Sequence, residues 1–291
     1  DSSNATSYYN LATALQLQQK HKEAFEYFKK SYEIEPSEFY LSAAAVGSIN
    51  AESWHNAIVY YQKLIIAHPE KQNFQYNLAT AYQQTGKYNE AIKLLTQLVA
   101  TNPKSVAMGQ RLADCYEKTG NLQMAKNTYT NLIRLGKIPA DVYYRYAILC
   151  MKTDDKDKAE TIFKKVIQLD PKNPYAHKDL GVVYLSQRLF DYAKEEFETA
   201  YKMAPEDSAV VFEMANFYHA MNDFQKAKDF YQKAYELSPD NMDIAVFMAI
   251  NYLRLNEIDT ALELFLEAMK KYPSQHIILF NIGLIYYQKG N

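Results

Sequence analysis

The sequence has few of the residues that mark disulfide-rich, metal-binding or irregular proteins. Its 291 residues include only 2 cysteines, 8 glycines, 9 prolines and 1 tryptophan. Cys115 and Cys150 match neither a Cys-x-x-Cys motif nor a zinc-finger spacing. The low glycine and proline content excludes the collagen-like and low-complexity classes. We therefore expect a folded protein without a disulfide framework, in which both cysteines are small buried hydrophobic residues.

An excess of one charge and long apolar runs are also absent. The 32 basic and 34 acidic residues leave a formal net charge of −2, so no overall positive field attracts nucleic acid or an anionic membrane. Runs such as 64–67 and 277–280 are far shorter than the roughly 20 apolar residues of a membrane-spanning helix. The composition predicts a soluble, cytoplasmic globular protein with no nucleic-acid partner and no membrane insertion.

Motifs that hold metals, phosphates or catalytic nucleophiles are missing. The 6 histidines are scattered along the chain, without a His-x-x-x-His or His-Glu-x-x-His pair. Neither a glycine-rich phosphate loop nor a Gly-x-Ser-x-Gly elbow occurs. We expect no metal, no cofactor and no catalytic residue within these 291 residues.

A repeat of about 34 residues runs through almost the whole chain. An alanine recurs at Ala24, Ala57, Ala91, Ala125, Ala159, Ala193, Ala227 and Ala261. Four residues after each alanine stands a bulky residue: Phe28, Tyr61, Leu95, Tyr129, Phe163, Phe197, Tyr231 and Phe265. Twelve residues before each alanine stands another small residue: Ala12, Ala45, Ala79, Ala113, Ala147, Gly181, Ala215 and Ala249. Because residues four apart share one face of a helix, the pattern predicts helices that pack closely through small side chains.

Prolines and turn residues divide each repeat into two helices. A proline stands twelve residues after the alanine in every repeat except the fourth, where Lys137 takes its place and Pro139 follows. Because proline does not fit a helix interior, it marks the end of the second helix. Residues that tolerate a left-handed backbone stand between the two helices: Gly86, Gly120, Asp154, Asn222, Asn256 and Gly290.

This pattern resembles the tetratricopeptide repeat (TPR) family, whose helix-turn-helix unit has about 34 residues. The family's leucine, small residue and tyrosine stand here as Leu78, Ala79 and Tyr82. The resemblance implies an all-α TPR solenoid, a right-handed superhelix with the first helix of each repeat on its inner wall. We expect a local distortion in the second repeat, where Ser48 replaces a tyrosine and Trp54 stands in the turn.

The repeat frame predicts one solenoid over residues 1–291, with seventeen helices. The repeats are 5–37, 38–71, 72–105, 106–139, 140–173, 174–207, 208–241 and 242–275, followed by the first helix of a ninth at 276–291. That last helix, ending at Gly290-Asn291, has an apolar face, and neither end of the chain has the polar cap with which solenoids normally end. We therefore predict that the chain is part of a longer protein.

The resemblance also indicates which residues line the concave groove. They are Asn10, Ala43, Asn77, Arg111, Arg145, Asp179, Glu213, Phe247 and Asn281. Asparagine binds a peptide backbone through both a donor and an acceptor, and arginine binds carboxylates. We predict that an acidic or carboxylate-ended peptide binds near Asn77, Arg111, Arg145 and Lys178, with Tyr76 and Tyr144 beside it, while Asp179 and Glu213 hold a basic residue. A solvated polar face without a ligand would show the same residues.

Three functions remain open. The first is a non-catalytic scaffold that binds a partner peptide or helix in the concave groove. The second is the recognition arm of a larger enzyme, such as a glycosyltransferase, whose catalytic domain is outside this chain. The third is a structural solenoid that associates with copies of itself through its uncapped ends.

Overall fold

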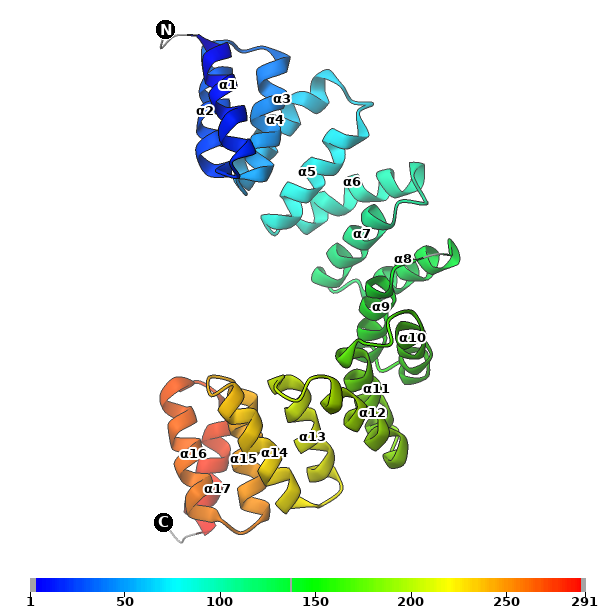
Figure 1. The fold of residues 1–291 in the computed structure, drawn as a ribbon, viewed down its shortest axis with the longest axis vertical. Coiled ribbons are helices and arrows are strands. Elements are labelled where there is room, and N and C mark those ends of the chain that lie inside the picture. The colour runs from blue at the N-terminus through cyan, green and yellow to red at the C-terminus, as the bar shows by residue number, and fades with distance from the viewer. Residues whose placement is uncertain (1–3, 137, 289–291) are drawn as a thin grey trace. The chain divides into compact units, whose positions relative to one another are not determined.

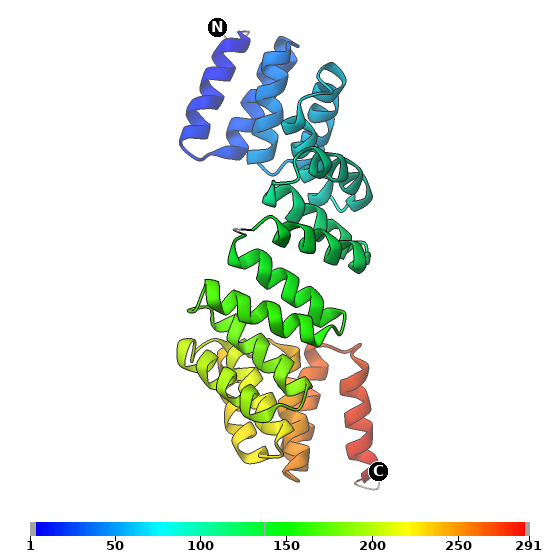
Figure 2. The same ribbon diagram turned by 90° about the vertical axis from the view of Figure 1, so that its right-hand side faces the viewer.

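The computed structural model describes residues 4–136 and 138–288. Over this range the chain forms seventeen α-helices and no strand, as the repeat predicts (Figures 1 and 2). The first helices of the repeats are α1 (Ala5–Leu17), α3 (Glu38–Asn50), α5 (Gln72–Gln84), α7 (Val106–Lys118), α9 (Ala140–Lys152), α11 (Pro174–Ser186), α13 (Ser208–Ala220), α15 (Met242–Arg254) and α17 (His276–Gln288). The second helices are α2 (His21–Ile34), α4 (Trp54–Ala67), α6 (Tyr88–Thr101), α8 (Leu122–Arg134), α10 (Lys156–Leu169), α12 (Phe190–Met203), α14 (Phe224–Leu237) and α16 (Ile258–Lys271).

Local sequence signals account for where the helices begin and end. Each first helix begins at a residue where the sequence places the start of a repeat. Ser37, Asn173 and Asp207 each precede such a helix and accept a hydrogen bond from its backbone N–H groups. Seven of the second helices end two residues before a proline. In the fourth repeat, α8 ends at Arg134 and Gly136 has a left-handed backbone, with φ of 72°.

The turn inside each repeat uses one left-handed residue. Gly86, Gly120, Asp154, Asn222 and Asn256 have the predicted positive φ, whereas Gly290 lies outside the described residues. The same repeat position has a positive φ at Gln19, Glu52 and Arg188, which their side chains do not favour. Packing of the two helices therefore imposes this conformation even where the residue type opposes it.

The predicted small and bulky residues form the core. The eight recurring alanines of the second helices are at most 1% exposed, and each bulky residue four positions later is at most 5% exposed. In the one repeat where the facing small residue is a glycine, Gly181, an added Cβ would lie 2.8 Å from the ring of Phe197. The small residues are therefore required by the close approach of the two helices.

The second repeat is regular, so the predicted distortion is wrong. Helix α3 ends at Asn50 and α4 begins at Trp54, which gives the same helix lengths and turn length as in the other repeats. Ser48 is buried and its hydroxyl donates a hydrogen bond to the carbonyl of Ala45, so the small polar side chain is satisfied locally.

The helices fall into two compact units, residues 1–138 and 139–291. The first unit contains α1–α8 and the second contains α9–α17. Within each unit, helices that follow one another in the chain pack side by side (Figure 1). The division falls at the boundary between the fourth and fifth predicted repeats, and the single solenoid expected over 1–291 stays a prediction.

Candidate functional site

The predicted groove residues all lie on first helices and divide between the two units. Asn10 is on α1, Tyr76 and Asn77 are on α5, and Arg111 is on α7, all in the first unit. The second unit holds Tyr144 and Arg145 on α9, Lys178 and Asp179 on α11, and Glu213 on α13. Asn10 and Arg145 are exposed, Asp179 is buried, and the remaining ones are half-buried, namely Tyr76, Asn77, Arg111, Tyr144, Lys178 and Glu213. We call the surface that these residues occupy in each unit its first-helix face.

In the first unit, Arg111 is held in place by uncharged groups. Its Nε donates a hydrogen bond of 3.3 Å to the hydroxyl of Tyr76, and its Nη1 donates to Oε1 of Gln83. The guanidinium carbon lies 5.3 Å from the centre of the Tyr76 ring, a cation–π distance. Over the described residues, the structure gives Arg111 no carboxylate partner. The guanidinium is therefore oriented by neutral groups, which do not balance its positive charge.

Asn77, on the same face, uses part of its amide inside the protein. Its Nδ2 donates a hydrogen bond of 2.9 Å to the hydroxyl of Tyr61, which is 1% exposed. Burial raises the pKa of Tyr61 to about 12, although the hydrogen bond from Asn77 acts in the opposite direction. The donor half of the Asn77 amide therefore satisfies a buried hydroxyl, which the predicted peptide-binding role did not include.

In the second unit, Asp179 is the centre of a buried network. It is 5% exposed, its Oδ2 accepts a hydrogen bond of 2.6 Å from the hydroxyl of Tyr144, and its Oδ1 lies 2.8 Å from Nζ of Lys178. Burial and the neighbouring Asp179 charge raise the pKa of Tyr144. Lys178, predicted as an anchor for an acidic ligand, thus has its charge balanced by its sequence neighbour.

Two further carboxylates of this unit belong to α13 and to the residue that caps it. The hydroxyl of Tyr175 donates a hydrogen bond of 2.6 Å to Asp207, which also caps α13. Burial alone would raise the pKa of Asp207, but hydrogen bonds from Tyr175 and from the backbone of Val210 outweigh it and lower the pKa. Glu213 accepts a hydrogen bond of 3.1 Å from Asn216, and burial raises the pKa of its carboxyl group.

Sequence reasoning missed the contacts that connect successive first helices. Tyr76 contacts Arg111, Tyr144 contacts Asp179, and the ring of Phe212 lies 5.6 Å from that of Phe247. Each pair is separated by 35 residues, one repeat plus one position. With this offset, the sequence would have predicted Tyr76 and Tyr144 as partners of the groove residues Arg111 and Asp179. Gln83, Tyr175 and Asp207 were not among the predicted groove residues.

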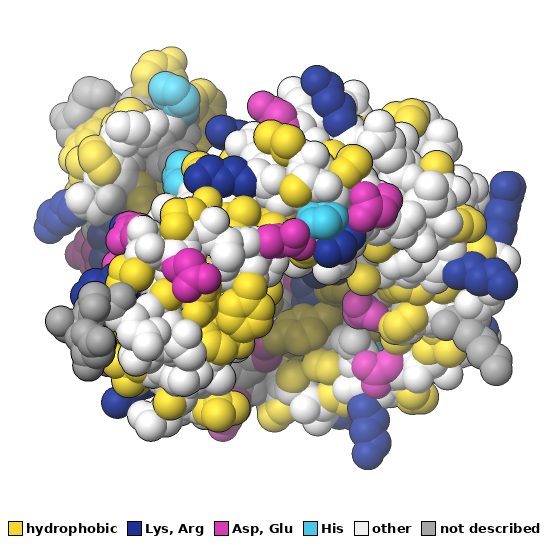
Figure 3. Space-filling model, turned by 90° about the horizontal axis from the view of Figure 1, so that it is seen from above, with side chains coloured by type: hydrophobic (Ala, Val, Ile, Leu, Met, Phe, Trp, Pro, Cys, Tyr) yellow, Lys and Arg dark blue, Asp and Glu magenta, His cyan; other side chains and the backbone are white. Residues whose placement is uncertain are grey.

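The described residues also bear on two other kinds of site, a metal site and a reactive cysteine. Among them, no group of three or more histidine, cysteine, aspartate or glutamate side chains is placed to hold a metal ion. Burial raises the pKa of the Cys115 thiol to about 11, so the reactive thiolate is scarce near neutral pH. None of the described helices has the length and apolar character needed to cross a membrane. Basic and acidic side chains are interspersed on the surface seen in Figure 3.

Models of the tetratricopeptide repeat match most of the sequence. One matches residues 49–109, 84–135 and 219–277, and a second matches residues 5–38. The model of the cilia and flagella-associated protein 70 middle TPR-like domain matches residues 110–238. None of the curated proteins matches the chain.

Several solved structures share the fold. A TPR protein from Parabacteroides merdae aligns with a TM-score of 0.70 and 18% identity over 84% of this chain and 97% of its own. A chain of the APC/C hetero-tetramer Cut9-Hcn1 aligns with a TM-score of 0.62 and 16% identity over 94% of this chain and 54% of its own, so the present chain spans about half of that protein. YrrB, described as a TPR protein with an unusual peptide-binding site, aligns with a TM-score of 0.52 and 16% identity over 63% of this chain and 95% of its own.

Proposed function

Because the chain belongs to the tetratricopeptide repeat family, we propose that it is a non-catalytic scaffold that binds a partner peptide on its first-helix face. Solenoids of this kind offer extended surfaces to protein and peptide partners. The observation that carries the proposal is the geometry of Arg111, whose guanidinium is fixed by Tyr76 and Gln83 without a carboxylate partner among the described residues. YrrB, with the same fold, is described as having a peptide-binding site.

The ligand group expected at Arg111 is a carboxylate, either of an acidic side chain or of a peptide C-terminus. A guanidinium presents several N–H donors in one plane, and only some of those of Arg111 are used by Tyr76 and Gln83. A side chain already held by two partners loses little conformational entropy when a ligand binds. Attraction between the two charges should weaken as salt is added, because charges are screened beyond about 10 Å at 0.1 M.

On the second unit the same face favours a basic partner group. Asp179 lies on α11, Glu213 lies on α13, and Asp207 is the residue before α13. Among the described residues, the ion pair that the structure shows for these three carboxylates is that of Asp179 with Lys178. Arg145, exposed on α9, adds a charge of the other sign on this face. A partner segment bound here would therefore present a lysine or arginine toward Asp207 and Glu213.

The experiment uses the whole chain and an array of octapeptides with free C-terminal carboxylates, half of them rich in aspartate and glutamate. We expect wild type to retain the acidic peptides, and Arg111→Glu to weaken their binding about tenfold to a hundredfold, as loss of a charge-assisted hydrogen bond does. Lys22→Glu, at an exposed position of α2, makes the same change in charge away from the site and is the matched control. Equal retention of acidic peptides by wild type and Arg111→Glu would contradict the proposal.

Self-association is a second candidate function, favoured by α17. Its side chains Ile277, Leu279, Phe280, Leu284, Tyr286 and Tyr287 are 40–80% exposed. Gly283 stands at the repeat position of Gly181, yet a Cβ added there would meet nothing within 4 Å. We propose that α17 of a second copy covers this surface. Light scattering at several concentrations should then show a dimer that is lost in Phe280→Glu and kept in Val59→Glu, a change of another exposed apolar residue. If the protein is a monomer at all concentrations, self-association through α17 is excluded.

A further inference from the structure

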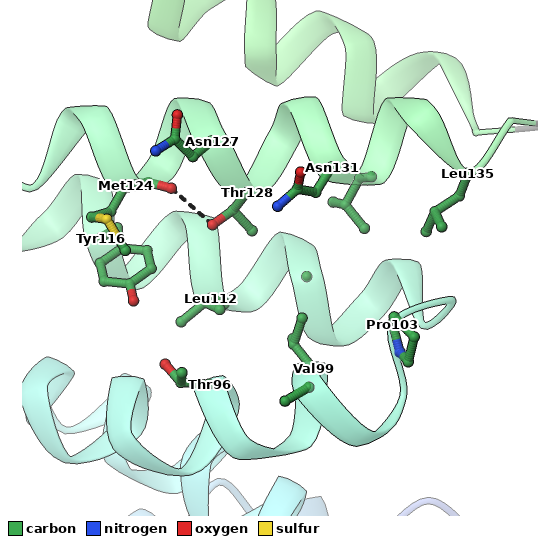
Figure 4. Close-up of a pocket in the computed structure, with 13 residues that line it drawn as sticks. Thr96, Val99, Pro103, Leu112, Tyr116, Met124, Asn127, Thr128, Asn131 and Leu135 are labelled. Carbon is green, nitrogen blue, oxygen red and sulfur yellow. Dashed lines mark hydrogen bonds between the residues drawn. The ribbon is translucent and has the colours of Figure 1, made fainter.

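Two apolar crevices in the first unit occupy the same position in successive repeats. One lies between α4 and α6 above α5, with a volume of about 490 Å³. The other lies between α6 and α8 above α7, with a volume of about 390 Å³ (Figure 4). Every residue that lines the first crevice has its counterpart, 34 positions later, in the lining of the second. The pairs that matter here are Ile65 with Val99, Ile66 with Ala100, and Leu94 with Thr128.

At two other junctions between repeats, two aromatic rings fill this space. Between the first two repeats, Tyr32 and Tyr60 stand at the positions of Ile65 and Leu94, with ring centres 5.9 Å apart. Between the sixth and seventh repeats, Tyr201 meets Phe230 at 5.5 Å in the same edge-to-face arrangement. At these two junctions, an internal aromatic pair closes the gap between neighbouring second helices.

In the two crevices the aromatic pair is replaced by smaller side chains. The first crevice has Ile65 and Leu94, and the second has Val99 and Thr128. Figure 4 shows Val99, Leu112 and Thr128, from three helices, around one space. Leu112 at the base is 5% exposed. Each crevice therefore has a buried apolar base and open space at the position where two other junctions hold an aromatic pair.

The rim of the crevices is apolar where other repeats are polar. Ile66 is 83% exposed, and Ala100 is the exposed equivalent in the next repeat. The remaining repeats have a charged or polar residue at this position, namely Glu33, Arg134, Gln168, Lys202, Glu236 and Lys270. Water favours such residues at an exposed helix position, so an isoleucine and an alanine limited to the two crevices indicate a surface that a partner covers.

We propose that the two crevices bind a partner's amphipathic helix, which inserts one aromatic side chain into each. The aromatic nature of the ligand follows from Tyr32–Tyr60 and Tyr201–Phe230, which fill the equivalent spaces. The site lies on the surface formed by second helices and is separate from the first-helix face that contains Arg111. Volumes of this size are within the range of about 300–1,000 Å³ that is usual for ligand pockets.

A helix fits this surface better than an extended segment does. An extended backbone needs partners for its own N–H and C=O groups. In the crevices, Gln62 already donates a hydrogen bond of 2.9 Å to the hydroxyl of Tyr82, and Thr128 donates one of 2.8 Å to the carbonyl of Met124. A helix satisfies its backbone internally and contributes only side chains, which matches an apolar lining.

The test uses the whole chain and fluorescein-labelled 18-residue helices of alanine, glutamate and lysine with two tryptophans. The tryptophans are placed at i and i+4, i+7 or i+11, which spans about 6, 10.5 or 16.5 Å at 1.5 Å per residue. Fluorescence anisotropy should show binding for the spacing that matches the two crevices. Replacing one tryptophan by alanine should then weaken binding about tenfold or more, as expected for loss of an aromatic anchor.

Two sets of variants close the site in different ways. Ile66→Lys with Ala100→Lys gives the rim the residue that Lys202 and Lys270 provide in other repeats, so the fold accommodates it. Val99→Tyr with Thr128→Phe rebuilds the Tyr201–Phe230 pair inside the second crevice. Each double variant should reduce binding about tenfold or more, while thermal melts remain those of a folded protein.

Matched controls separate this site from the others. Val59→Lys changes an exposed apolar residue of α4 outside the crevices, and Arg111→Glu changes the first-helix face, so both should bind as wild type does. A proline-interrupted peptide with the same two tryptophans should not bind. The proposal is overturned if no spacing binds, if both double variants bind as wild type does, or if the proline-interrupted peptide binds equally well.

Discussion

The hydroxyl of Tyr144 donates a hydrogen bond of 2.6 Å to Oδ2 of Asp179, one repeat further along the chain. The same offset joins Tyr76 to Arg111, where the tyrosine hydroxyl accepts from Nε. The same backbone arrangement therefore places a tyrosine beside a carboxylate in one case and beside a guanidinium in the other. Both pairs form because a phenol hydroxyl can donate and accept hydrogen bonds. The carboxylate is buried and bound to Lys178, whereas the guanidinium is half-buried with neutral partners. Asp179 thus has its charge balanced inside the protein, whereas the charge of Arg111 has only neutral partners.

The structural role of Asp179 leads to the first prediction. Asp179→Ala should lower the free energy of unfolding by about 3–5 kcal/mol, because it leaves the Tyr144 hydroxyl and the partly buried Lys178 ammonium without their partner. Urea unfolding measures the change. Tyr144→Phe, which removes only the hydroxyl, should cost about 1–2 kcal/mol. A loss below 1 kcal/mol for Asp179→Ala would mean that water replaces the network.

The core alanines lead to the second prediction. Ala159 is fully buried, so Ala159→Leu should destabilise the protein by roughly 1–3 kcal/mol or more through overpacking. Arg145→Ala, at an exposed position, should change stability by only about 0.5 kcal/mol. Thermal melts of the two variants give the order. If Arg145→Ala were the more destabilising change, Arg145 would have a structural role and would no longer be a candidate for binding a partner.

The third prediction concerns the left-handed residue in the turns. Arg188 has φ of 61°, which costs a residue with a Cβ roughly 1–2 kcal/mol, whereas glycine adopts it freely. Arg188→Gly should therefore raise the free energy of unfolding by about 0.5–1 kcal/mol, once the entropy that glycine loses on folding is subtracted. Asn222→Gly, at the same repeat position with φ of 60°, is the control and should gain less, because asparagine tolerates this conformation. Chemical unfolding measures these changes. A lower free energy of unfolding for Arg188→Gly than for wild type would contradict the cost that we assign to the left-handed backbone at Arg188.

The fourth prediction is a pH dependence at Glu213. Burial raises the pKa of its carboxyl group above the ordinary 4.5, so the folded state holds the proton to a higher pH than the unfolded state does. The stabilisation from this group is fully present below pH 4.5 and is lost as the pH rises through the folded-state pKa. The side chain of Glu213→Gln cannot ionise, so this variant should lose less stability than wild type does as the pH increases.

Urea midpoints between about pH 4 and pH 8 test this, since the slope of stability with pH reports the difference in bound protons. Glu206→Gln, a change of an exposed carboxylate, is the control and should follow the wild-type profile. If Glu213→Gln also follows the wild-type profile, the carboxylate is hydrated in the folded protein.

The sequence by itself determined the helices and their order, because those depend on local signals. The recurring alanine and the bulky residue four positions later define the buried face, and a proline such as Pro171 or Pro205 marks where a second helix has ended. These signals act within one repeat, and the 34-residue period carries the prediction along the chain.

Only the tertiary structure decided what the side chains on the surfaces do. The positive φ of Arg188, the Asp179–Lys178 pair and the use of Asn77 by Tyr61 depend on which neighbour each residue meets after folding. The crevices depend on pairs about 29 positions apart, such as Val99 and Thr128, whose size matters only once two helices stand beside each other. Local periodicity shows which residues share one face of a helix. A site also depends on the distance between neighbouring helices, and side-chain packing sets that distance.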